Sequence, residues 1–218
     1  MRGRIRSYDQ AARNAQDGSS LAETAEHALE SASEMLSRMR ELSVRAGNDT
    51  LAVTDRVALE SEFQSLVEEV DRVANETQFN GTSLLDGSAT NVAIQVGAED
   101  GDVYSVPLAN IQSTTLEIDS LDVMSSTNAS NALETLDSAI TSVNAARGSF
   151  GAARNALDGQ QTSLRNSSTM LSAAESRLRD ADYAQGSADL TRQLILQQSK
   201  AAVQVQLNSD SSQASDLL

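Results

Sequence analysis

The sequence contains no cysteine and no tryptophan, and its 218 residues include a single proline, Pro107. Without cysteine, neither a disulfide framework nor a thiolate metal site is possible. No apolar run is long enough to cross a bilayer as a helix, and no apolar signal-peptide segment follows Met1. Aromatic residues make up only 3% of the chain, which disfavours a compact α/β enzyme. The composition favours long helices that pack closely through small residues.

Positive charge is also scarce. The chain has 16 basic and 31 acidic residues, which gives a formal net charge of −15. This charge repels phosphate backbones and anionic membranes, so we expect neither nucleic acid nor a membrane as a partner. The single histidine, His27, has no second histidine or cysteine with which to hold a transition metal. No phosphate-binding or nucleophile motif occurs, and we expect no metal, no cofactor and no enzymatic activity.

The most regular feature is a heptad repeat in residues 132–179. An apolar residue occupies every seventh position, in the row Leu136, Val143, Phe150, Leu157, Leu164, Leu171 and Leu178. Small residues follow at a spacing of three, at Ala139, Ala146, Ala153, Ala174 and Ala181. This spacing is typical of a helix in a coiled coil or a long bundle. Such a helix is too long for a small globule to cover, so it requires partner helices of similar length.

Two earlier segments have the pattern expected of those partners. Residues 10–47 carry the 4-3 row Leu21, Ala25, Ala28, Ala32, Met35, Met39, Leu42 and Ala46. Residues 55–76 carry the shorter row Leu59, Phe63, Leu66, Val70 and Val73. The short connection between them predicts that the second helix folds back antiparallel on the first.

Residues 91–108 alternate apolar and polar side chains around a Gly- and Asp-rich turn, which predicts a β-hairpin. After residue 179, Gly186 is expected to break the long helix, and a final helix with an apolar side follows. Its large apolar residues include Leu190, Leu194, Ile195, Val203 and Leu207. The predicted fold is mainly α: a long antiparallel helical bundle or coiled-coil rod with one small β-hairpin and a C-terminal amphipathic helix.

Six short motifs together resemble bacterial flagellin, and they span nearly the whole chain in the order of that family. They are ARNAQDG at 12–18, LSRMRELSV at 36–44, FNGTSLLDG at 79–87, IQVG at 94–97, SRLRDADYA at 176–184 and ILQQ at 195–198. No single motif is specific, but six in the same order are.

The resemblance implies a division into two parts. Residues 1–180 are expected to form the rod-like core domain of a flagellin, and residues 181–218 the C-terminal half of its axial domain. Flagellins normally have a further segment before the position of Met1, so we expect the chain to be truncated at its N-terminus. Only residues 109–131 separate the hairpin from the long helix, so we also expect the variable outer domains to be lacking.

The resemblance also implies two recognition surfaces. Arg38 and Leu42, with Glu62 on the neighbouring helix, match the surface that the host Toll-like flagellin receptor reads. By periodicity alone, Leu42 is instead a core residue and Arg38 lies on a solvated face. The tail 181–218 matches the segment held by the flagellin export chaperone and later packed along the filament axis. A frayed C-terminus without function is the alternative.

The function implied is that of a structural subunit of the bacterial flagellar filament, secreted and extracellular, which self-assembles into the propeller used for motility. Its expected partners are other flagellin subunits, the export chaperone, the filament cap protein and the host receptor. The alternative is an adhesin-like or receptor-ligand binding rod. A secreted enzyme is disfavoured because the chain has no inserted domain in which an active site would lie.

Overall fold

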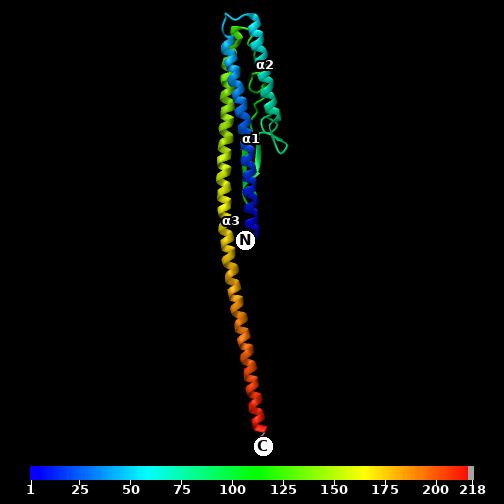
Figure 1. The fold of residues 1–218 in the computed structure, drawn as a ribbon, viewed down its shortest axis with the longest axis vertical. Coiled ribbons are helices and arrows are strands. Elements are labelled where there is room, and N and C mark those ends of the chain that lie inside the picture. Colours follow the sequence, from blue (N-terminus) through cyan, green and yellow to red (C-terminus); the bar gives the residue numbers. More distant parts are fainter. Residues whose placement is uncertain (216–218) are drawn as a thin grey trace. The chain divides into compact units, whose positions relative to one another are not determined.

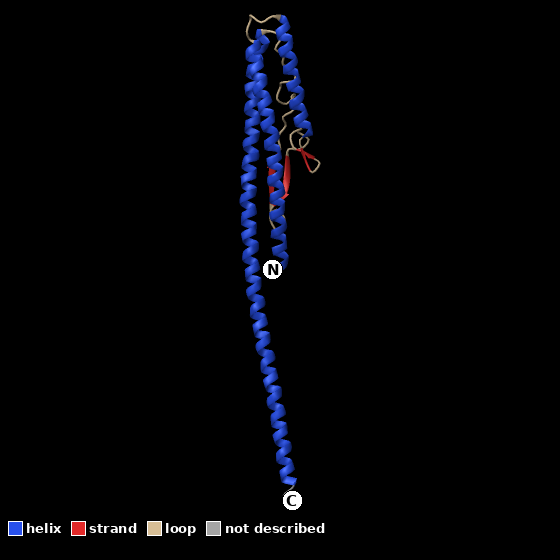
Figure 2. Ribbon diagram, in the orientation of Figure 1, coloured by secondary structure: helices blue, strands red, loops and turns tan. Residues whose placement is uncertain are grey.

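The structure is a computed structural model that describes residues 1–215, with side chains described as far as residue 206. In chain order the elements are α1 (Arg2–Ala46), α2 (Val53–Glu76), β1 (Gln78–Phe79), β2 (Thr82–Ser83), β3 (Asn91–Gln95), β4 (Val103–Pro107) and α3 (Ser126–Ser215). Within residues 1–215 the fold consists of three helices and two small antiparallel sheets (Figure 2), which confirms the predicted fold class. The chain forms two compact units, Arg6–Ser167 and the smaller pair Met1–Ile5 with Ser168–Leu218.

Within the larger unit, α1 and α3 lie side by side and antiparallel (Figure 1). Polar side chains link them at intervals along their length. The Ser19 hydroxyl donates to Asp158 at 2.9 Å. The ion pairs are Arg154–Glu26 at 2.7 Å, Arg147–Glu30 at 3.5 Å and Arg40–Asp137 at 2.6 Å. The α3 partner moves back towards the start of α3 as the α1 residue number rises, so these links follow one antiparallel register.

Two rows, each repeating every seven residues, form most of the buried side of α1 from residue 22 onward, with Leu42 buried beside them. One row is Ala25, Ala32, Met39 and Ala46, and the other is Ala22, Leu29, Leu36 and Ser43. The first row agrees with the sequence prediction. The second is displaced by one position, since Leu29 and Leu36 are fully buried while Ala28 and Met35 are only half-buried. α1 packs against α3 and also against α2 and the loops. The buried face of α1 is therefore the one that carries the larger side chains Leu29 and Leu36.

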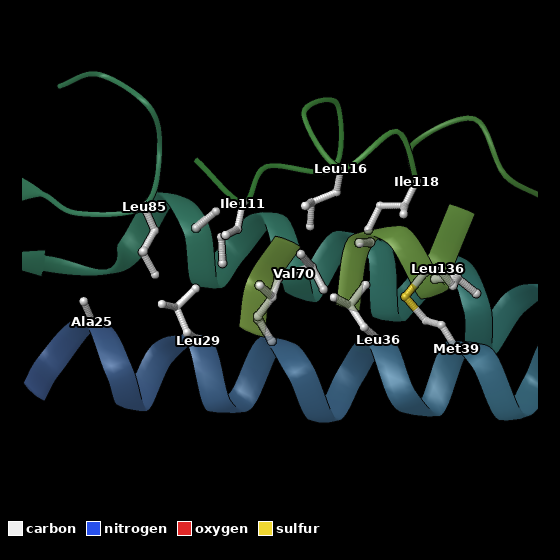
Figure 3. Close-up of a cluster of buried hydrophobic side chains, with 14 of the residues drawn as sticks. Ala25, Leu29, Leu36, Met39, Val70, Leu85, Ile111, Leu116, Ile118 and Leu136 are labelled. Atoms are coloured by element: carbon white, nitrogen blue, oxygen red, sulfur yellow. The ribbon is translucent and has the colours of Figure 1, made fainter. Parts of the chain in front are cut away.

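The close-up in Figure 3 shows how α1 completes this core with segments distant in the sequence. Leu29, Leu36 and Met39 of α1 point towards Val70 of α2 and Leu136 of α3. Leu85, Ile111, Leu116 and Ile118, which come from the connections between the helices, cover the same cluster. The core therefore depends on irregular segments as well as on helices.

Polar side chains of α2 hold the long connection before α3 in place. The Asp71 carboxylate accepts hydrogen bonds from the Ser113 backbone N–H at 2.7 Å and from its hydroxyl at 2.6 Å. Glu60 accepts from the Val123 N–H at 2.7 Å, and Gln64 donates to the Leu121 carbonyl at 2.9 Å. These bonds satisfy backbone groups that no regular ladder pairs, and they allow the apolar side chains of this connection to face the core.

A buried arginine closes the corner between α1 and α2. The Arg56 side chain donates to the Ala46 carbonyl and, at 2.9 Å, to the Asn48 carbonyl. The last carbonyls of a helix have no partner within the helix, and a buried one is costly to leave unpaired. Arg56 supplies that partner, which explains why a charged residue is only 8% exposed.

The strands form two hairpins. β3 and β4 pair antiparallel with Asn91 opposite Pro107 and Gln95 opposite Val103, close to the predicted hairpin at 91–108. The β1–β2 pair was not expected. Its turn, Asn80–Gly81, has positive φ at both residues (49° and 81°), the conformation in which Asn-Gly favours a two-residue hairpin.

The larger hairpin sits against both long helices. Asn14 of α1 donates to the Gln95 carbonyl at 3.0 Å, and Gln160 of α3 donates to the Val96 carbonyl at 3.3 Å. Gly18 permits this packing, since a Cβ there would lie 2.6 Å from Ile94 Cδ1 and 3.0 Å from Leu157 Cδ1. A side chain at position 18 would require the Ile94 and Leu157 side chains to move.

The helix bounds differ from those expected at about 10–47, 55–76 and 132–179. α1 begins at Arg2, and α3 runs without interruption from Ser126 to Ser215, so Gly186 does not break it. A glycine inside a helix costs about 1 kcal/mol relative to alanine, whereas each further helical residue adds a backbone hydrogen bond once the helix exists. A single glycine is therefore tolerated.

The heptad row of α3 is buried from Leu136 to Leu164. Beyond that residue Leu171 is half-buried and Leu178 is 60% exposed. Leu164 packs with Ala11, Ala12 and Tyr8 of α1 in a small cluster of its own.

We predict that Leu164→Ala lowers the free energy of unfolding by about 2 kcal/mol or more, because it removes buried methyl groups and leaves a cavity. The matched control Leu178→Ala removes the same atoms from an exposed position and is expected to cost less than about 0.5 kcal/mol. Urea unfolding followed by circular dichroism measures both. An equal loss of unfolding free energy in the two variants would mean that the buried row of α3 does not end after Leu164.

Candidate assembly and recognition surfaces

The tail of α3 in the smaller unit is exposed as far as its side chains are described. Every residue from 176 to 206 is exposed. The predicted tail residues Leu190, Leu194, Ile195 and Val203 have exposed fractions between 51% and 59%. The side chain of Leu207, the fifth residue predicted there, lies outside the described residues.

The apolar side chains of the tail occupy more than one face of the helix. Leu190 and Leu194 are four residues apart and share a face. Leu196 and Val203, seven residues apart, share another, and they are 53% and 59% exposed. Leu196 follows Leu194 by two residues, which places it about 200° further around the helix. A helix that is apolar on several sides is normally buried by more than one neighbour.

A shallow hollow interrupts the tail at Gly186. Its lining includes Tyr183, Ser187 and Leu190. Gly186 carries no side chain, and nothing lies within 4 Å of where its Cβ would be, so the hollow is open between the Tyr183 ring and Leu190. Tyr183 is 82% exposed, so its ring is open to solvent beside this hollow.

At the start of the tail, Glu175 binds two arginines. It accepts hydrogen bonds from Arg2 of α1 and from Arg179 one turn further along α3. The hydrogen bond from Arg2, followed by that from Arg179, lowers the pKa of the Glu175 carboxyl below its ordinary value. These bonds join the beginning of α1 to α3 within the smaller unit.

The residues predicted for receptor recognition separate into two groups. Arg38 of α1 donates from Nε to Glu62 Oε1 of α2 at 2.8 Å and from Nη1 to Glu41 Oε2 at 3.0 Å. The Arg38 and Glu62 side chains are 49% and 44% exposed. The hydrogen bond to Glu62, then that to Glu41, raises the pKa of Arg38 above its ordinary value. Arg38 and Glu62 therefore form one charged surface feature across two helices.

Leu42 does not belong to that surface. Its side chain is 2% exposed and lies in the main hydrophobic core, which corrects the expectation that it offers an apolar contact to a receptor. Position 42 faces inward because it lies beside the buried rows of α1, as the heptad interpretation implied. The exposed apolar residue nearby is Val44, at 56%.

Two further properties of the described residues bear on function. No helix among them combines the length and apolar character needed to cross a membrane. The same part of the chain contains no group of three or more His, Cys, Asp or Glu side chains placed to hold a metal ion.

In the larger unit the helices bury their own apolar core. In the smaller unit a helix leaves apolar side chains exposed on several faces. This combination defines a class of structural proteins that assemble through helices. Two family models match the chain: the bacterial flagellin N-terminal helical region over residues 1–90 and the bacterial flagellin C-terminal helical region over residues 133–218. The flagellin of Halalkalibacterium halodurans is 40% identical over 210 residues, covering 95% of this chain and 77% of that protein.

Other relatives agree. The Bacillus subtilis flagellin is 35% identical over 242 residues, covering 95% of this chain and 80% of its own length. The crystal structure of Bacillus cereus flagellin superimposes with a TM-score of 0.64 at 34% identity, covering 75% of this chain and 94% of that one. The chain belongs to the bacterial flagellin family. It is a structural subunit of the extracellular flagellar filament that serves motility, and the alternative of an adhesin-like rod is not favoured.

We predict that backbone amides of residues 181–206 exchange hydrogen faster than those of residues 132–164 in the isolated chain, because no packed neighbour covers the tail. Hydrogen exchange read by mass spectrometry tests this directly. Equal protection would mean that the tail docks on other residues, and the exposed surface described above would not exist in solution.

Proposed function

We propose that the chain acts in the filament as a two-part subunit, with residues 1–180 as the core rod domain and residues 181–218 as the axial segment. The single observation that supports this division is the unbroken exposure of residues 176–206, which carry large apolar side chains. The core buries its own apolar rows, so it needs no second chain to fold. The tail needs partners.

The energetic reason for tail packing is the apolar surface that it leaves in water. Full burial of a Leu, Ile or Val side chain is worth about 1.5–3 kcal/mol. Six such residues, Leu190, Leu194, Ile195, Leu196, Val203 and Val205, are each between 51% and 69% exposed. Burying the remaining half of each would contribute roughly 5–9 kcal/mol per subunit. That is enough to favour tails packed on several sides, in agreement with apolar residues on more than one face.

We predict that the triple variant L190Q/I195Q/L196Q assembles much more weakly than the parent chain, because polar side chains on several faces of the tail cannot be buried at low cost. The measurements are sedimentation and electron microscopy under salting-out conditions. A matched control replaces three exposed apolar residues of the larger unit, Val44, Val57 and Met124, with Gln. If the tail variant assembles like the control, the axial role proposed for residues 181–218 is wrong.

Before assembly, the same side chains would be exposed in the exported subunit. We infer that the flagellin export chaperone covers Leu190, Leu194, Ile195, Val203 and Leu207 at that stage, because a chaperone that masks an apolar helix prevents premature association. The filament cap protein, expected from the resemblance, stays a prediction, since no contact among the described residues bears on it.

The receptor surface that we propose consists of Arg38 and Glu62, with Glu41 beside them. The Arg38 side chain bridges two carboxylates from α1 and α2, so a receptor would meet a preformed charged group rather than flexible side chains. Such groups act as hot spots when a partner desolvates them. Leu42 would act only indirectly, by supporting the helix beneath this surface.

We predict that Arg38→Ala weakens binding to the ectodomain of the host Toll-like flagellin receptor by roughly tenfold or more, equivalent to about 1.4 kcal/mol. The matched control is Arg45→Ala, which changes an exposed arginine about two helical turns further along α1. It should leave the affinity for the receptor unchanged. Leu42→Ala should lower stability in urea unfolding more than it lowers affinity. Absence of binding by the parent chain would remove the receptor assignment and leave the filament role intact.

A further inference from the structure

The negative charge of this chain is concentrated in one layer of the fold. Residues 53–125, here called the acidic layer, comprise α2, both hairpins and the connection to α3. They contain fourteen acidic residues and two basic ones, Arg56 and Arg72. The layer therefore carries a charge of −12 out of the total of −15, while the rest of the chain is close to neutral.

None of the acidic side chains in the layer is buried. The fourteen are Asp55, Glu60, Glu62, Glu68, Glu69, Asp71, Glu76, Asp86, Glu99, Asp100, Asp102, Glu117, Asp119 and Asp122, and every one is exposed or half-exposed. Within the larger unit, α2 and the connections lie alongside α1 (Figure 1). The layer thus presents most of the charge of the chain together, on one side of the helix pair.

Little positive charge offsets it. Arg56 is buried at the α1–α2 corner. Arg72 is shared between Glu69 and Glu76 on its own helix, and Arg38 of α1 binds Glu62. From residue 73 to residue 146 the sequence has no lysine, arginine or histidine and has ten acidic residues. α2 also ends without a basic residue in its last turn, where a positive charge would favour the helix dipole.

We propose that mobile cations in the surrounding solution stabilise the acidic layer by screening its self-repulsion, so that this flagellin core is a salt-requiring fold. A high charge of one sign destabilises a compact state because like charges are held closer than in the unfolded chain. Screening shortens the range of that repulsion from about 30 Å at 0.01 M salt to about 3 Å at 1 M. The effect is diffuse and requires no individual ion-binding site.

The layer also contributes to the core, which links charge to stability. Asp71 and Glu60 hold the connection through backbone hydrogen bonds, and that connection places Ile118 and Val123 in the core. When repulsion at low salt loosens the layer, part of the cover of α1 is lost with it. The requirement concerns a single folded chain and stands apart from the filament role proposed above.

The test compares two triple variants that have the same net charge. E68Q/D100N/D119N neutralises three exposed carboxylates of the layer, and D17N/E23Q/E34Q neutralises three exposed carboxylates of α1 outside it. Urea unfolding of each chain and of the parent is measured in NaCl and KCl from about 0.02 M to 1 M, a range over which the screening length falls from about 20 Å to about 3 Å. The readout is the rise in the urea midpoint with salt.

We expect the midpoint of the parent chain to rise with either salt, and the layer variant to lose roughly two fifths of that rise, since self-repulsion grows with the square of the charge. The α1 variant should keep most of it. A parent midpoint that does not change with salt would overturn the proposal, as would equal losses in both variants. If a few millimolar MgCl₂ gave the full rise alone, bound divalent ions rather than screening would be responsible and the proposal would be wrong.

Discussion

The antiparallel packing of α1 against the first part of α3 is the contact on which the rest of the structure depends. Its rows repeat every seven residues on both helices, with Leu29 and Leu36 on α1 and Leu136 and Leu157 on α3 fully buried. Small residues between them, such as Ala25 and Ala32, let the backbones approach. Once this pair is in register, α2 has a surface on which to fold back, and the hairpin fits where Gly18 leaves room. A slip along this pair would misplace every later element.

The two compact units meet the same physical requirement in different ways. In the larger unit the apolar residues of three helices and of the connections bury one another, so a single chain is sufficient. In the tail, one helix carries large apolar residues on several sides, and no described residue covers them. A folded core that is joined to an uncovered helix suits a subunit that is stable before it is incorporated, and that releases further free energy only when other chains arrive.

Electrostatics divides the chain along a different line. α1 and α3 pair their charges with each other, as in Arg154 with Glu26 and Arg40 with Asp137, and are almost neutral together. The acidic layer has few such partners, chiefly Arg72 of α2 and Arg38 of α1, so its cohesion rests mainly on apolar burial and on hydrogen bonds such as those of Asp71. The same carboxylates therefore hold the connection in place and repel one another, which makes the solution around the protein part of its stability.

The sequence by itself determined the class of the fold, because heptad rows and an alternating hairpin are local patterns, and it determined the family through six motifs that occur in the order of that family. It also placed Arg38 and Glu62 together and identified the apolar tail. Which of two adjacent rows of α1 is buried was decided only by tertiary structure, since Ala28 and Leu29 fit a seven-residue period equally well until α2 and the connections occupy one side. The burial of Leu42, by contrast, agrees with its position in the predicted heptad row. The contacts of Asp71 with Ser113 and of Arg56 with the end of α1 likewise emerged only in three dimensions, because each pairs a side chain with a backbone position that no periodic pattern marks.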